Sequence, residues 1–204
     1  SIAFGTEESD CLYLGILNIT NGRIAEYEKC YKALLSIVDD SDIQMRYAEE
    51  LASAVRNSHY VNYLISFYKT LKDRQLAANR KDNAELIDVY CGQLLYSIGS
   101  YDMAWVFCFD AADSVSNGKE PEFIVADNLV SKLLLASLLW DNDKHNPTAS
   151  RKCLDAAKDF AESHLESIDS RRLINIYGNL SVAFSESGAY TKAEEYAQKA
   201  ILLS

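Results

Sequence analysis

The stretch Tyr177–Ala200, YGNLSVAFSESGAYTKAEEYAQKA, decides the fold of this chain. Its turn glycine, the aromatic residue after it and two alanines recur earlier in the sequence: Gly188, Tyr190, Ala193 and Ala200 have the same spacing as Gly99, Tyr101, Ala104 and Ala111. A pattern that recurs at fixed spacing is typical of helical-repeat proteins, in which each repeat buries its apolar face only by stacking on its neighbours. The repetition therefore predicts stacked helix pairs that offer a surface to a partner.

The rest of the sequence also follows helical spacing. Apolar residues recur on one helix face, as at Leu129, Leu133, Ala136 and Trp140. The 204 residues include only 2 prolines and 8 glycines, which suits long helices joined by short turns. Because no sustained alternation of β-branched residues occurs, we predict an all-α chain.

The best-formed repeat resembles the tetratricopeptide repeat, a pair of antiparallel helices of about 34 residues. The resemblance rests on Tyr177, Leu180, Ser181 and Phe184 in the first helix, and on the glycine, aromatic and alanines that follow. It implies a right-handed α-solenoid of about five antiparallel helix pairs in a single domain over residues 1–204. One small residue marks each first helix: Gly15, Ala52, Gly92, Ser137 and Ser181. The hairpins are expected roughly at 8–38, 42–76, 82–116, 122–162 and 170–204.

Motifs of common enzyme classes do not occur in this sequence. It has no GxSxG, P-loop, GxGxxG or HExxH pattern. Its five cysteines form no CxxC pair, and its three histidines lie far apart, so no metal-ligand spacing is present. We therefore expect a noncatalytic protein without cofactor or metal, whose cysteines are buried reduced thiols.

The net charge of the chain indicates which class of partner it can bind. The formal net charge is -10, from 30 acidic and 20 basic residues, and no dense cluster of Lys and Arg occurs. Because binding to nucleic acid depends on such clusters, we expect none through this chain. No run of about 18 apolar residues is present, which disfavours a membrane-spanning helix. A peptide or protein partner and a cytoplasmic location are the resulting expectations.

The resemblance also implies which residues line a concave groove, because first helices face inward in such stacks. The groove would use Arg46, Glu49, Arg56 and Asn57 in the second hairpin, Gln93 and Tyr96 in the third, and Asn175 and Asn179 in the last, with Gly178 and Val182 beside them. Two asparagines at i and i+4 project from one helix face. A side-chain amide has a donor and an acceptor edge that can pair with the backbone of an extended peptide.

Two functional hypotheses follow. The first is an interaction domain that binds a peptide or protein segment. A narrower version is similar to the sensor domains of peptide-pheromone regulators of Gram-positive bacteria (the Rap, Rgg and PlcR kind), which carry an amino-terminal DNA-binding or effector part that is not readable here. The alternative is a scaffold subunit that self-associates through its terminal hairpins. It is suggested by Ile201, Leu202 and Leu203, which stand where a solenoid normally needs a polar cap. Continuation of the chain beyond Ser204 would equally cover these three residues.

Overall fold

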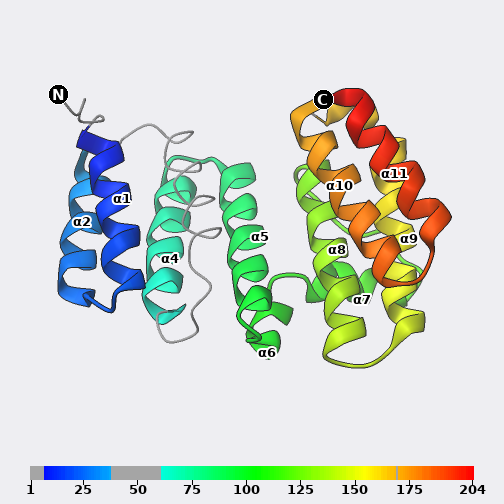
Figure 1. The fold of residues 1–204 in the computed structure, drawn as a ribbon, viewed down its shortest axis with the longest axis horizontal. Helices are drawn as coiled ribbons and strands as arrows, with labels where there is room; N and C mark the ends of the chain where they lie inside the picture. Colours follow the sequence, from blue (N-terminus) through cyan, green and yellow to red (C-terminus); the bar gives the residue numbers. More distant parts are fainter. Residues whose placement is uncertain (1–6, 38–60, 169) are drawn as a thin grey trace. The chain divides into compact units, whose positions relative to one another are not determined.

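The computed structural model describes residues 7–37, 61–168 and 170–204 (Figure 1). Apart from a short 3-10 turn at Leu165–Ser167, the regular structure in these ranges consists of α-helices. They are α1 (Glu7–Thr20), α2 (Ile24–Ile37), α4 (Val61–Ala77), α5 (Lys81–Ser97), α6 (Tyr101–Trp105), α7 (Phe109–Ser116), α8 (Ala126–Asn142), α9 (Pro147–Ser163), α10 (Ser170–Glu186) and α11 (Tyr190–Leu203). The prediction of an all-α chain is confirmed for the described residues. The chain divides into two compact units, one up to Ser100 and one from Tyr101.

The first unit contains two packed helix pairs, α1 with α2 and α4 with α5. Between α4 and α5 the chain turns at Asn79, whose φ of 59° lies in the left-handed region that asparagine tolerates. The Lys72 ammonium on α4 lies 2.6 Å from the Asp88 carboxylate on α5. Across the same pair the Asn83 amide donates to Gln75 Oε1 at 3.2 Å, so the two helices are joined by polar contacts as well as by their core.

The second unit is built from the pairs α8 with α9 and α10 with α11. Helix α7 packs on α8 and α9, and α10 contacts both of them. One continuous core joins these helices, and it includes Leu129, Leu133, Leu154, Leu180 and Phe184. Packed adjacent helix pairs, the second part of the predicted architecture, are therefore present in both units.

The glycine of the repeat pattern forms the turn between α10 and α11. Gly188 has a φ of 76°, and the Ala189 amide after it donates to the Phe184 carbonyl at 2.8 Å. Glycine adopts a positive φ without the steric cost that a Cβ atom imposes, so it commonly ends a helix in this way. Gly99, its counterpart in the repeat pattern, follows α5 with a φ of 78°.

The segment after Gly99 forms two short helices, α6 and α7, rather than one. Helix α6 is held by Trp105, whose indole Nε1 donates to Asp143 Oδ2 at 2.9 Å and whose ring meets Trp140 edge-on at 5.0 Å. Hydrogen bonds from Lys144 and then from Trp105 hold the pKa of the Asp143 carboxyl below its ordinary value. Because α5 belongs to the first unit and α6 to the second, the predicted hairpin 82–116 and the single domain over 1–204 stay predictions.

The five cysteines are all free thiols. Cys91, Cys108 and Cys153 are buried, and Cys11 and Cys30 are partly buried. Burial raises the pKa of Cys108 to about 12 and that of Cys153 to about 11, so both thiols are protonated near neutral pH. The predicted burial is thus present at Cys91, Cys108 and Cys153, and the reduced state stays a prediction.

Candidate functional site

Helix α10 presents an open face that carries both of its predicted asparagines. Asn175 and Asn179 are exposed, and Val182, which follows them on the same side, is 57% exposed. An atom added at the Cβ position of Gly178 would meet nothing within 4 Å. Asn175, Gly178, Asn179 and Val182 thus lie together on one accessible surface. We call this surface the α10 ledge.

The spacing on the ledge matches that of an extended peptide. Four residues of an α-helix advance about 6 Å along its axis. Two residues of an extended strand advance about 6.6–6.8 Å. Asn175 and Asn179 can therefore pair with alternate peptide groups of a strand that runs along α10, while Gly178 allows its backbone to approach closely.

The opposite face of α10 is buried and fixes the ledge in place. Leu180 and Phe184 are fully buried, and the Phe184 ring stacks on Tyr196 of α11 at 5.5 Å. The Ser181 hydroxyl donates to the Ala193 carbonyl of α11 at 2.8 Å. These contacts lie where the repeat pattern places its aromatic and small residues, so the pattern accounts for the buried face of α10 and leaves the asparagines unexplained by packing.

A polar network joins α9 to α11 next to this core. The Tyr196 hydroxyl donates to Glu162 Oε1 at 2.7 Å, and the Lys199 ammonium lies 3.0 Å from the same oxygen. Burial acts to raise the pKa of Glu162, but the hydrogen bonds from Tyr196 and Lys199 outweigh it, and the pKa lies below its ordinary value. Burial, and then the bond to Glu162, raise the pKa of Tyr196 well above its ordinary value. The network therefore orients α11, on which α10 packs.

Of the other predicted site residues, the structure describes two, and both belong to the first unit. Gln93 is exposed and Tyr96 is partly buried, and both belong to α5 in the first unit. The remaining predicted residues, Arg46, Glu49, Arg56 and Asn57, lie outside the described residues. A single groove formed by the predicted residues of the second, third and last hairpins stays a prediction.

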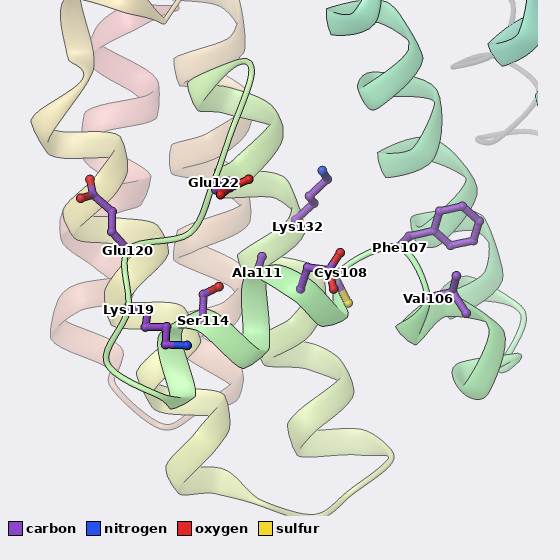
Figure 2. A pocket seen from close by; sticks show the side chains of 10 residues that line it. Val106, Phe107, Cys108, Ala111, Ser114, Lys119, Glu120, Glu122 and Lys132 are labelled. Carbon is purple, nitrogen blue, oxygen red and sulfur yellow. The ribbon is translucent and has the colours of Figure 1, made fainter. Parts of the chain in front are cut away.

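The second unit also contains a pocket that sequence reasoning missed (Figure 2). Its volume is about 390 Å³, and it lies between α7, the loop after it and α8. Charged side chains on that loop, Lys119, Glu120 and Glu122, line it together with Lys132 of α8. The only signal in the sequence is the charged run KEPE at 119–122, which by itself indicates no more than a polar loop.

Within the described ranges, no cluster of three or more His, Cys, Asp or Glu side chains has an arrangement suited to a metal ion. Among the described helices, none combines the length and apolar character needed to cross a bilayer. Comparison of the chain with models of known protein families and with curated proteins gives no significant match.

Proposed function

We propose that this chain is a noncatalytic helical-repeat interaction domain that binds an extended peptide or protein segment along the α10 ledge. The observation that carries the proposal is the pair of exposed amides, Asn175 and Asn179, beside the open position at Gly178. Buried contacts on the other side of α10 keep this surface in one orientation, so binding requires little reorganisation.

The finer parts of the proposal come from the resemblance to tetratricopeptide repeats. They are a right-handed solenoid, a groove that extends beyond α10, and a role as a peptide-sensing regulatory domain. Packed adjacent helix pairs and the positive φ at Gly188 support the repeat architecture. In such a regulatory role, binding of the peptide would control the activity of an effector. This role is part of the proposal.

The first test is a selection of random short peptides displayed on phage, with the full chain as bait. Peptides recovered on the unmodified chain are then titrated against the double variant Asn175→Ala, Asn179→Ala. Loss of the two amides should weaken binding by about 1–3 kcal/mol, or roughly 5- to 150-fold, because each neutral hydrogen bond contributes about 0.5–1.5 kcal/mol. Bound peptide should also raise the melting temperature of the unmodified chain.

The matched control for this test is Gln198→Ala on α11, because Gln198 is also an exposed amide in the second unit. It should leave both peptide affinity and folding unchanged. Equal peptide affinity of the double variant and the control variant would show that the ledge is not the binding site. Failure to recover any peptide that raises the melting temperature would contradict the proposed function itself.

A self-associating scaffold is the second candidate, and one observation favours it. Ile201 and Leu202 on α11 are 70% and 85% exposed, although both are large and apolar. Adjacent exposed apolar residues on one helix are typical of surfaces that pack on another element. Sedimentation equilibrium should then show a mass that rises with concentration, and Leu202→Asp should abolish the rise. A constant monomer mass at all concentrations would exclude this scaffold role.

A further inference from the structure

The pocket beside α7 is lined by four parts of the chain (Figure 2). Val106, Phe107 and Cys108 come from the junction of α6 and α7, and Asp110, Ala111 and Ser114 come from α7 itself. The loop after Gly118 contributes Lys119, Glu120 and Glu122, and Lys132 comes from α8. A volume of about 390 Å³ lies at the lower end of the range of about 300–1,000 Å³ that is usual for small-ligand sites.

The lining contains charged side chains of both signs, and several of them form no ion pair with another described residue. Four of these side chains form no ion pair among the described residues: Asp110, Lys119, Glu120 and Glu122. Some other charged side chains of the second unit are paired: Lys144 lies 2.7 Å from Asp143, and Lys199 lies 3.0 Å from Glu162. Carboxylates and an ammonium are thus gathered around one cavity and are available to a ligand.

Two residues of the lining are uncharged and buried. Cys108 is 1% exposed and Ala111 is 6% exposed. Burial, and then the neighbouring Cys153, raise the pKa of Cys108 to about 12, although the charge of Lys132 opposes this effect. The thiol is therefore protonated and unreactive near neutral pH, so Cys108 offers apolar contact.

We propose that this pocket binds a small zwitterionic ligand of the free amino acid or short peptide class. Its ammonium would meet the carboxylates of Glu122 and Asp110, and its carboxylate would meet the Lys119 ammonium. A ligand with a single charge would be attracted by the side chains of one sign and repelled by those of the other, whereas a zwitterion satisfies both. Val106 and Phe107 provide apolar contact for its side chains. This site is independent of the α10 ledge.

Calorimetric titration of the full chain with three forms of one dipeptide tests the proposal. Leucylphenylalanine carries both charges, its N-acetyl derivative carries only the carboxylate, and its carboxamide carries only the ammonium. The zwitterion should bind, and each blocked form should bind about tenfold more weakly, because one charge-assisted contact in a partly exposed site is lost. Absence of heat with all three forms, or equal affinity for them, would overturn the proposal.

Charge-removing variants assign the two ends of the ligand. Glu122→Gln should weaken binding of the zwitterion and the carboxamide but not of the N-acetyl form. Lys119→Gln should weaken binding of the zwitterion and the N-acetyl form but not of the carboxamide. Two exposed residues away from the pocket provide matched controls, Glu186→Gln and Lys152→Gln, and neither should change any affinity.

A pocket variant that weakens all three forms equally would refute the charge assignment. If only the carboxamide binds, the pocket is a cation site and the zwitterion proposal is wrong. The variant Asn175→Ala, Asn179→Ala should bind the dipeptide normally, so failure of this proposal is distinguishable from failure of the α10 ledge.

Discussion

Replacing Gly178 by alanine should stabilise the second unit, whereas the same change at Gly188 should destabilise it. An added Cβ meets no atom within 4 Å at either position, so the two sites differ in backbone conformation and not in available space. Gly178 lies inside α10, where glycine is less favourable than alanine by about 0.5–1 kcal/mol. Gly188 has a φ of 76°, a left-handed conformation that costs a residue with a Cβ atom about 1–2 kcal/mol.

Urea unfolding monitored by tryptophan fluorescence measures both effects. The chain has two tryptophans, Trp105 and Trp140, and both belong to the second unit, so the signal reports on that unit alone. The expected free energy of unfolding rises by about 0.5–1 kcal/mol for Gly178→Ala and falls by about 1–2 kcal/mol for Gly188→Ala. Each kcal/mol corresponds to a shift of about 2–4 °C in melting temperature for a chain of this size. Destabilisation by Gly178→Ala would show that this face of α10 is packed and not open.

A larger side chain at the same position separates folding from binding. Gly178→Leu should leave the unit at least as stable as the unmodified chain, because leucine is a good helix former and projects into open space. The same side chain would cover the surface beside Asn175 and Asn179 and exclude a peptide backbone. Peptides selected on the unmodified chain should therefore lose most of their affinity. Retained affinity in a stable Gly178→Leu variant would refute binding along the ledge.

Three further outcomes test the core and the polar contacts. Phe184→Ala should lower the free energy of unfolding by about 3–5 kcal/mol because the ring is fully buried, and a loss under about 1 kcal/mol would contradict the packing of α10 on α11. The buried hydroxyls of Ser137 and Ser150 lie 3.0 Å apart, so either single change to alanine should cost about 1–3 kcal/mol, and the double change less than the sum of the two. Folding lowers the pKa of Glu162, so the contribution of its carboxylate to the free energy of unfolding is present above the ordinary pKa of 4.5 and is lost as the pH falls through the lowered pKa. Glu162→Gln should therefore make the free energy of unfolding less sensitive to acid. An unchanged pH profile would exclude this role.

Sequence reasoning predicted the features that depend on neighbouring residues along the chain. The stripe of Leu129, Leu133 and Ala136 is buried, because helical periodicity places these residues on one face. The turn at Gly188 follows from the positive φ that favours glycine. The exposure of Asn175 agrees with its place between the apolar positions of α10.

Features that join distant segments were not predicted. The contact of Trp105 with Asp143 and that of Glu162 with Tyr196 link residues far apart in the sequence. Neither residue pair can be recognised in the sequence, because a hydrogen bond of this kind depends on the register in which two distant segments pack and leaves no local sequence pattern.

The sequence by itself determined that this chain forms helices, where the turn of its last repeat lies, and which side of α10 is apolar. These properties follow from backbone hydrogen bonds between residues four apart and from the periodic placement of apolar side chains. Only the tertiary structure decided that Lys119, Glu122 and Lys132 line one pocket, and that a Cβ added at Gly178 would meet no atom of the described residues within 4 Å. The reason is physical: which side chains meet, and which stay open, depends on how separate helices pack, and that packing is set by the whole core and not by local spacing.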